Sequence, residues 1–320
     1  MLSRRVLLGA GAGLLAPTLA HAQGSQGFPS RNITIIVPFA PGASSDGIAR
    51  LVGEKLGEAF GKTVVEENKA GGGGTTGLIA LARSAPDGHT LGVGAPGALA
   101  INPHIAELNV NFKPLQELTP IAKLIDIPLV LATNPQSGFK TLPELIAQSK
   151  AKPEGITYGS TGTNSAQHLS VELLKKSTGA NLTHVPYRGS APVITDLLGG
   201  QIQMASVDLT AAAPHIAAGK VIALAVTSPK RVELAPDIPT IAETVPGFDI
   251  TAWMGMLGPA GMDPAIVEQI AGHIRQAQSD ATYVSRVRNL ACVEGFLGPK
   301  EFAAFWERES NKMKALIQGS

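Results

Sequence analysis

The fold is decided by the stretch Ile33-Thr34-Ile35-Ile36-Val37-Pro38-Phe39-Ala40-Pro41-Gly42-Ala43-Ser44-Ser45-Asp46. Its first part is a run of mostly β-branched residues that stops at Pro38, and its second part is a loop of small and hydroxyl-bearing residues. The residues that follow are apolar at the spacing of one helix face, and Gly61 closes the pattern of Ile48, Leu51, Val52, Leu56 and Phe60. The stretch therefore predicts a strand, a loop and a helix in that order.

The loop of this unit is suited to a small anion. It lies at the amino end of the predicted helix, where the first backbone N–H groups lack helical partners and carry partial positive charge. Ser44 and Ser45 add hydroxyl donors, and the loop has no Lys or Arg, so backbone dipoles supply the charge. The alternative is structural: Ser44, Ser45 or Asp46 only caps the helix.

The first 22 residues have the pattern of an export signal. Arg4 and Arg5 precede an uncharged stretch rich in Leu, Ala and Gly, and Ala20-His21-Ala22 matches the A-x-A cleavage pattern. The apolar part is shorter than the ~20 residues of a membrane helix. We predict cleavage after Ala22 and a mature chain in the periplasm, with the general secretory and twin-arginine routes both open.

Composition excludes several classes of partner. The mature chain has 24 basic and 25 acidic residues, a net charge of −1, which argues against nucleic acid or an anionic membrane as a general partner. The single cysteine, Cys292, cannot form an internal disulfide and is expected to be a buried thiol. The mature chain is long enough for two domains of ~100–200 residues. It has no further stretch of membrane-helix length, so it is expected not to be membrane-inserted.

A second glycine-rich loop follows the next predicted strand, Thr63 to Asn68. Gly72-x-Gly74-x-x-Gly77 formally matches a dinucleotide-binding pattern, but that pattern should follow the first strand and have an acidic residue at the end of the next one. Here the nearest candidate, Asp87, lies in a turn before the predicted strand Thr90 to Gly94. The loop is therefore interpreted as bare backbone that can approach an anion closely.

The second half of the chain repeats this architecture without a repeat in sequence. Predicted strands at 156–158, 183–187 and 204–207 each end in small or polar residues. The predicted fold class is α/β, with two open α/β lobes around a ligand cleft. Apolar segments at 121–133 and 250–258 would cross between the lobes. This places residues 23–126 and 250–320, including helices at 264–277 and 299–317, in a discontinuous lobe 1, and residues 127–249 in lobe 2.

The sequence lacks the common motifs of metal sites, nucleotide-binding loops and serine hydrolases. The patterns His-Glu-x-x-His, paired Cys-x-x-Cys and Gly-x-x-x-x-Gly-Lys-Ser/Thr are missing, so no metal site and no cofactor is predicted. The Gly-x-Ser-x-Gly pattern of serine hydrolases is missing too. Ser44, Ser160, Ser165 or Ser190 could still meet His168 or His184 in space, which leaves a hydrolase open.

Three polar residues of the second half keep two interpretations each. His168 begins the helix after the Ser160 loop and either donates to a bound anion or packs against its own loop. Arg188, the only cation in a candidate cleft loop, either clamps a carboxylate or forms a salt bridge to Asp208 or to the opposite lobe. Asp208 either accepts a hydrogen bond from a ligand amine or hydroxyl or caps the helix that follows it.

Eight short motifs occur along the chain: Ile33-Thr34-Ile35-Ile36-Val37-Pro38-Phe39-Ala40-Pro41-Gly42, Val65-Glu66-Glu67-Asn68, Ala85-Pro86-Asp87-Gly88-His89-Thr90-Leu91, Ala100-Ile101-Asn102-Pro103, His184-Val185-Pro186-Tyr187-Arg188-Gly189-Ser190-Ala191-Pro192, Thr195-Asp196-Leu197-Leu198-Gly199-Gly200-Gln201, Ala223-Leu224-Ala225-Val226-Thr227-Ser228 and Asp237-Ile238-Pro239-Thr240. In this order they resemble the Bug-type extracytoplasmic solute-binding receptors of tripartite tricarboxylate transporters. Each motif alone is weak, but eight in the right order are specific. The resemblance covers essentially the whole mature chain.

The resemblance implies a type II periplasmic-binding-protein fold that closes on a small, usually carboxylated solute and delivers it to a membrane permease. Two departures bear on the ligand: Ala43 stands where the family often has a second glycine, and a frequent Pro-Pro pair after Pro38 is missing. We add Asp46 and His168 to the positions carried over. The candidate ligand-binding residues are Phe39, Ala43, Ser44, Ser45, Asp46, Gly73 and Thr75 in lobe 1, and Ser160, Thr161, Gly162, Ser165, His168, Arg188, Gly189 and Asp208 in lobe 2.

We therefore predict a periplasmic receptor, not an enzyme, that binds a di- or tricarboxylate, an amino acid or an aromatic acid. Lobe closure would be a hinge motion near Ile127 and Trp253. The expected partners are the carboxylate and the permease subunits of a tripartite transporter, and the expected oligomeric state is a monomer. The alternatives are a secreted hydrolase and an NAD-dependent oxidoreductase.

Overall fold

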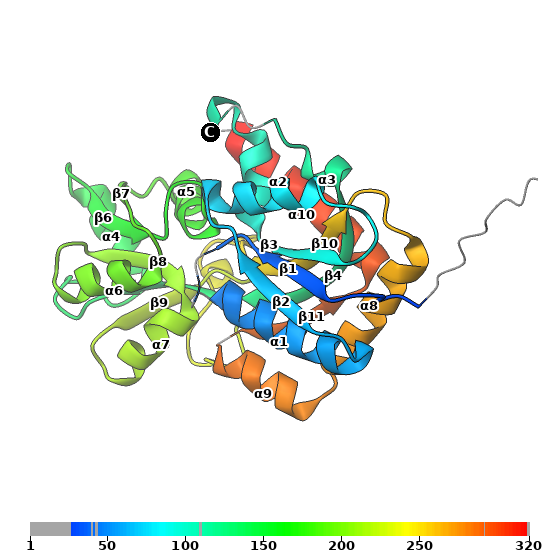
Figure 1. The fold of residues 1–320 in the computed structure, drawn as a ribbon. Coiled ribbons are helices and arrows are strands. Elements are labelled where there is room, and N and C mark those ends of the chain that lie inside the picture. Colours follow the sequence, from blue (N-terminus) through cyan, green and yellow to red (C-terminus); the bar gives the residue numbers. More distant parts are fainter. Residues whose placement is uncertain (1–26, 40, 42–43, 109–110, 291, 319–320) are drawn as a thin grey trace, which may run out of the picture.

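Two β-sheets lying side by side form the frame of the molecule (Figure 1). The computed structural model describes residues 27–39, 41, 44–108, 111–290 and 292–318. The predicted signal peptide, residues 1–22, and Ala43 lie outside the described residues. Within the described ranges, no helix combines the length and the apolar character needed to cross a bilayer.

The larger sheet, with the helices packed on it, is called lobe 1. β1 is parallel to β2 and β3, whereas β10 is antiparallel to β3 and β4, and β11 is antiparallel to β4. The carboxyl ends of β1, β2, β3 and β4 therefore lie at the same edge. In spatial order the six strands are β11 (Val293–Leu297), β4 (Leu118–Ile127), β10 (Ala252–Pro259), β3 (Thr90–Gly94), β1 (Ile33–Val37) and β2 (Val64–Asn68).

The smaller sheet, with its helices, is called lobe 2. β6 is parallel to β7 and β8, and β5 is antiparallel to β8 and β9. In spatial order the five strands are β7 (Leu182–Pro186), β6 (Ile156–Ser160), β8 (Met204–Asp208), β5 (Leu129–Thr133) and β9 (Ile222–Val226). The helical elements of lobe 2 are α4 (Leu142–Ala151), α5 (Ala166–Thr178), α6 (Ser190–Leu198), α7 (Leu209–Ala217) and the 3-10 turn η5 (Ile241–Glu243).

Helices cover both sides of the lobe 1 sheet. In Figure 1, α2 and α10 lie on one side of it and α1 and α9 on the other. The helical elements of lobe 1 are α1 (Ser44–Phe60), α2 (Thr75–Ala82), α3 (Pro114–Glu117), α8 (Pro264–Ala277), α9 (Ala281–Asn289), α10 (Pro299–Gln318) and the short turns η1 (Gly72–Gly74), η2 (Gly97–Ile101), η3 (Asn102–His104) and η4 (Ala106–Leu108).

The strand, loop and helix predicted from the opening stretch are confirmed as β1 and α1. Ile48, Leu51 and Leu56 are buried at the predicted helix face, and each such side chain contributes about 1.5–3 kcal/mol on burial. Gly61, just after α1, has a φ of 61°, which glycine adopts without steric cost. Packing of this face against the sheet fixes the direction in which α1 leaves the β1 loop.

The chain crosses between the sheets at the two predicted segments. β4 belongs to the lobe 1 sheet and β5 to the lobe 2 sheet, and only Pro128 separates them. Proline has no N–H to donate to a ladder, so it interrupts sheet pairing where the chain changes lobes. The return segment leaves β9, forms a hydrogen bond from Ile250 N to Thr227 O at 3.2 Å and enters β10. The lobe boundaries at residues 127 and 250 stay a prediction.

α9 and β11 were not predicted from the sequence, which placed only two helices, at 264–277 and 299–317, after β10. β11 has a polar residue and a glycine in its middle, Glu294 and Gly295, which weaken the strand pattern. Gly295 is needed there: a Cβ atom at this position would lie 2.6 Å from Asp126 Oδ2 and 2.7 Å from Lys123 Nζ. A side chain at position 295 would therefore clash with this charged pair on β4.

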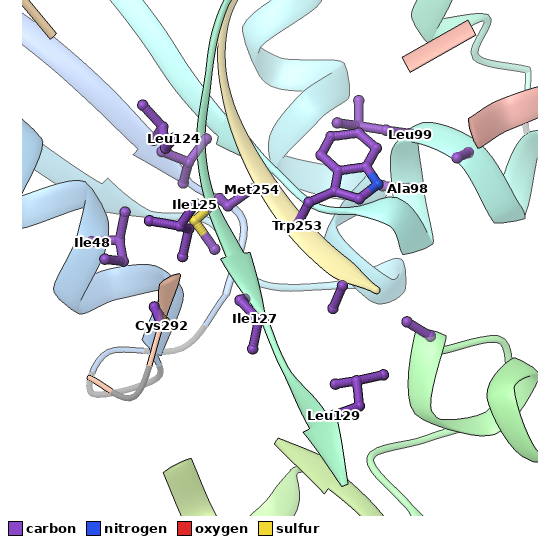
Figure 2. Packing of buried hydrophobic residues seen from close by; sticks show 14 of the residues in the cluster. Ile48, Ala98, Leu99, Leu124, Ile125, Ile127, Leu129, Trp253, Met254 and Cys292 are labelled. Carbon is purple, nitrogen blue, oxygen red and sulfur yellow. The ribbon is translucent and has the colours of Figure 1, made fainter. Parts of the chain in front are cut away.

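One large apolar core fills lobe 1 and continues into lobe 2. Figure 2 shows the part of it around β4, with Ile125, Ile127 and Cys292. The Cys292 side chain is fully buried and unpaired, which confirms the predicted buried thiol. Trp253 on β10 is also fully buried and packs edge-on against Phe302 and Phe305 of α10. The return crossing is thus anchored in lobe 1 by its largest side chain.

Candidate functional site

The candidate residues lie in loops that follow parallel strands of both sheets. In lobe 1 these are the β1–α1 loop and the glycine loop between β2 and α2, and in lobe 2 the loops after β6, β7 and β8. Such loops share one sheet edge, which is where open α/β sheets bind ligands. Two cavities, of about 590 Å³ between α1 and α8 and about 330 Å³ near the crossings, are lined by none of the candidate residues.

Asp46 links the first turn of α1 to the end of β2. Its carboxylate accepts from Arg50 through Nε at 3.0 Å and Nη2 at 3.1 Å, and from Asn68 Nδ2 at 2.9 Å. Asn68 Nδ2 also lies 3.0 Å from the carbonyl oxygen of Phe39, to which it donates. The side chain of Asp46 is buried, so it orients the start of α1 rather than lining a site. Ser45 beside it is also buried, and Ser44 begins the helix.

The glycine loop brings Phe39, Gly73 and Thr75 together. Gly71, Gly72, Gly73 and Gly74 all have positive φ angles, between 56° and 145°, which glycine adopts without steric cost. Asn102 Nδ2 donates to Gly72 O and to Thr75 Oγ1, both at 3.2 Å. A Cβ atom at Gly74 would lie 3.4 Å from the Phe39 ring, and one at Gly73 would lie 3.3 Å from Asn102 Nδ2.

Two residues of this loop region were missed as site residues. Asn102 was quoted only as part of a motif, although the Asn-Pro pair at a strand-end loop was a usable signal. Lys69, at the start of the loop, is a second cation besides Arg188, and its Nζ atom lies 3.2 Å from Glu67 Oε1. The loops are therefore poor in cations, but not free of them.

Ser160 and Ser165 tie the β6–α5 loop to itself. Ser160 Oγ lies 2.7 Å from His184 Nε2 and 3.2 Å from the Gly162 N–H, and its side chain is fully buried. Ser165 Oγ donates to Gly162 O at 2.7 Å and accepts from His168 N at 3.1 Å, which caps α5. The two hydroxyls hold the loop, and Thr161 and Gly162 between them are half-buried.

His168 packs against its own loop, the second of its two interpretations. Its Nδ1 atom accepts from the Asn164 N–H at 3.2 Å, so this nitrogen has no proton to donate to an anion. Its ring lies 4.1 Å from that of His184, which stacks on Tyr158 at 5.0 Å. Burial lowers the pKa of His168, and burial together with His168 lowers the pKa of His184 to about 4. Both rings are neutral at pH 7.

The pair Ser160 and His184 does not provide a hydrolase site. A serine nucleophile needs an accessible hydroxyl and a base near neutral pKa. The Ser160 hydroxyl is fully buried, and the pKa of His184, at about 4, makes it a weak base. The described residues also contain no group of three or more His, Cys, Asp or Glu side chains placed to hold a metal ion.

Arg188 and Gly189 lie between β7 and α6. Arg188 is exposed, and no ion pair joins it to Asp208 or to another described residue, so both salt-bridge alternatives are wrong for this structure. Gly189 has a φ of 110° and stands at the amino end of α6. The guanidinium is therefore available to an anion that reaches this helix end.

Asp208 does not cap α7. It occupies the N-cap position without a side-chain hydrogen bond to the helix. Its Oδ1 atom instead accepts from Gln167 Nε2 of α5 at 2.5 Å. Burial raises the pKa of Asp208 against the opposing hydrogen bond from Gln167. Of its two interpretations, capping is wrong, and contact with a ligand stays a prediction.

Two α/β lobes joined by two crossings, with small polar loops at the strand ends, define the class of two-lobed solute-binding proteins. The family model of the tripartite tricarboxylate transporter family receptor matches residues 48–320. The chain belongs to this receptor family. The predicted family and the predicted two-lobed α/β fold are therefore confirmed.

Known proteins support the same class. BugT of Bordetella pertussis is 38% identical over 268 residues, which are 83% of this chain and 80% of BugT. The R. palustris protein Rpa4515, solved with adipate, is 30% identical with a TM-score of 0.81, over 91% of this chain and 97% of that one. MatC from Rhodopseudomonas palustris, solved with malate, is 28% identical with a TM-score of 0.78, over 91% of this chain and 100% of that one. The family comprises receptors, so the hydrolase and oxidoreductase alternatives are set aside.

Proposed function

We propose that this chain binds a small organic carboxylate between its two lobes and delivers it to the permease subunits of a tripartite transporter. The observation that carries the proposal is the set of strand-end loops that are rich in glycine and hydroxyl-bearing residues but contain few cations. Backbone dipoles at helix starts stabilise a carboxylate without a fixed opposite charge. The adipate and malate in the two similar structures support a carboxylate here.

The candidate residues divide into two groups by their contacts. One group holds the loops, because its side chains form hydrogen bonds within the loops or to the elements next to them: Asp46, Thr75, Ser160, Ser165 and His168. The other group would contact the ligand. It contains Phe39, Ala43, Ser44, Ser45 and Gly73 from lobe 1, and Thr161, Gly162, Arg188, Gly189 and Asp208 from lobe 2.

The biological setting is part of the proposal. Residues 1–22 would direct export and be removed after Ala22, and the mature chain would act in the periplasm as a monomer. Residues 23–126 and 250–320 would move as one lobe against residues 127–249, with hinges near Ile127 and Trp253. The described part of the chain supports this division, because its sheets change at Pro128 and again before β10.

The test is thermal unfolding of the mature chain with a panel of carboxylates, after partial unfolding and dialysis to remove carried-over ligand. A ligand at 100 times its Kd adds about 2.7 kcal/mol, which raises the midpoint by roughly 5–10 °C for a domain of this size. Arg188→Gln should reduce the shift, whereas Arg83→Gln, which changes an exposed residue outside the site, should not. A panel in which no carboxylate raises the midpoint would overturn the proposal.

A further inference from the structure

The carboxyl group of Asp208 points away from the helix that it precedes. An aspartate at an N-cap ordinarily accepts from the first N–H groups of its own helix, and Asp208 makes no such bond. Gln167 holds it instead, at 2.5 Å, from the first turn of α5. Gln167 is itself buried, so the carboxyl group is fixed on the side of lobe 2 where the β6–α5 loop ends and α5 begins.

The topology places Asp208 beside the candidate ligand loops. β6 and β8 are parallel neighbours, with Tyr158 opposite Met204 and Gly159 opposite Ala205. Asp208 and the loop that contains Thr161 and Gly162 therefore leave the sheet at the same edge.

Asp208 also lies near lobe 1. Thr210 Oγ1, in the first turn of α7, donates to Leu290 O of lobe 1 at 2.8 Å. Leu290 in turn packs on α1, where a Cβ atom at Gly47 would lie 3.1 Å from its Cδ1 atom. These contacts bring the start of α7 close to the start of α1, the proposed carboxylate site.

The second oxygen of Asp208 lacks a partner. Within the described residues, Gln167 supplies the one hydrogen bond to this carboxyl group, and it goes to Oδ1. Arg188 follows β7, which β6 separates from β8, so its backbone lies about 10 Å away. Asp208 is half-buried, and Oδ2 is not one of the enclosed side-chain atoms that lack a partner, so a hydrogen-bond donor on the ligand can reach this oxygen.

We propose that Asp208 selects a carboxylate that carries a hydroxyl or ammonium group, in preference to a simple dicarboxylate. The inference rests on the proposed function and names the ligand class of the same site. A hydroxyl or ammonium group donates to Oδ2, and an ammonium group adds a charge-assisted bond. A simple dicarboxylate has no such donor, so Oδ2 would stay without a hydrogen bond when it binds.

Two matched ligand series test the selection by calorimetry at pH 7.5. Succinate, malate and aspartate differ only at C2, as do glutarate, 2-hydroxyglutarate and glutamate. In the wild-type protein we expect the hydroxy acid or the amino acid of one series to bind at least about 10-fold more tightly than the simple diacid. Asp208→Ala should abolish this difference.

Asp208→Asn distinguishes a ligand hydroxyl from a ligand ammonium group as the donor, because asparagine keeps a carbonyl acceptor and removes the negative charge. If the ligand donor is an ammonium group, affinity for the amino acid should fall about 10-fold or more. If it is a hydroxyl group, affinity for the hydroxy acid should stay within about threefold. Glu154→Gln, which changes an exposed carboxylate of lobe 2 outside the site, is the matched control.

The outcomes distinguish this inference from the function on which it rests. If carboxylates bind but the simple diacids bind as tightly as their substituted partners, the role of Asp208 is wrong and the receptor proposal stands. If no carboxylate of either series or of the wider panel binds, the receptor proposal itself fails.

Discussion

The hydroxyl of Ser160 illustrates what a loop residue contributes when its side chain faces inward. The resemblance to the receptor family predicted that Ser160 contacts the ligand. In the structure its Oγ atom lies 2.7 Å from His184 Nε2 and 3.2 Å from the Gly162 N–H group. A residue type and its place in a loop can be read from the sequence. The direction of a hydroxyl cannot, because it depends on a histidine 24 residues away.

Ser160→Ala should therefore lower stability. Removing the hydroxyl leaves His184 Nε2 and the Gly162 N–H without this partner, which costs about 1–3 kcal/mol in the free energy of unfolding. The measurement is urea unfolding of the ligand-free protein. Ser177→Ala is the matched control, since Ser177 is exposed on α5 of the same lobe. An equal effect of the two substitutions would contradict the positioning role.

At the scale of elements, the prediction succeeded where periodicity is strong. β3, β6 and α8 fall where the apolar runs and caps place them, and Asp263 Oδ1 accepts from Ala265 N at 2.8 Å at the start of α8. α9 and β11 were missed, since Gly295 and Glu294 give β11 no apolar alternation. The pattern of a segment predicts its structure only when the segment buries a face of its own.

The stability of the region around α5 and β7 should depend on pH through His168 of α5 and His184 of β7. In the folded protein burial lowers the pKa of His168 and of His184, the latter to about 4, whereas an unfolded histidine titrates near ~6.5. The unfolded chain thus binds more protons between these values, so the free energy of unfolding falls as pH falls from ~6.5 toward 4. Above pH 7 this contribution is constant.

The test compares the pH dependence of unfolding in His184→Gln with the wild type. The glutamine amide can still bond to Ser160 but does not titrate. The free energy of unfolding of the His184→Gln variant should therefore fall less between pH 6.5 and pH 4.5 than that of the wild type. Tyr158, Glu172 and Lys175 also face the histidines, and they are common to both proteins. A wild-type slope in His184→Gln would refute the assignment.

On the scale of the whole molecule, the lobes are joined by more than the two crossings. The sequence predicted the crossings from their apolar runs, but not the contact of α7 with Leu290, because Leu290 belongs to the missed α9–β11 region. Thr210 is an ordinary helix residue in sequence. Only the packing of lobe 1 against lobe 2 makes its hydroxyl a donor to the other lobe.

Thr210→Val should change the balance between lobe arrangements without unfolding either lobe. The substitution removes the interlobe hydrogen bond of 2.8 Å and keeps the side-chain shape, so the free energy of unfolding should fall by no more than about 1 kcal/mol. Ligand binding to a two-state molecule depends on the fraction in the competent arrangement. The radius of gyration of the ligand-free protein in small-angle scattering should therefore change, and the Kd for a bound carboxylate should change with it.

Thr195→Val, which removes a hydroxyl that donates within α6, should leave both values unchanged. If Thr210→Val behaves like this control, Leu290 and α7 merely touch, and closure is governed by the crossings alone.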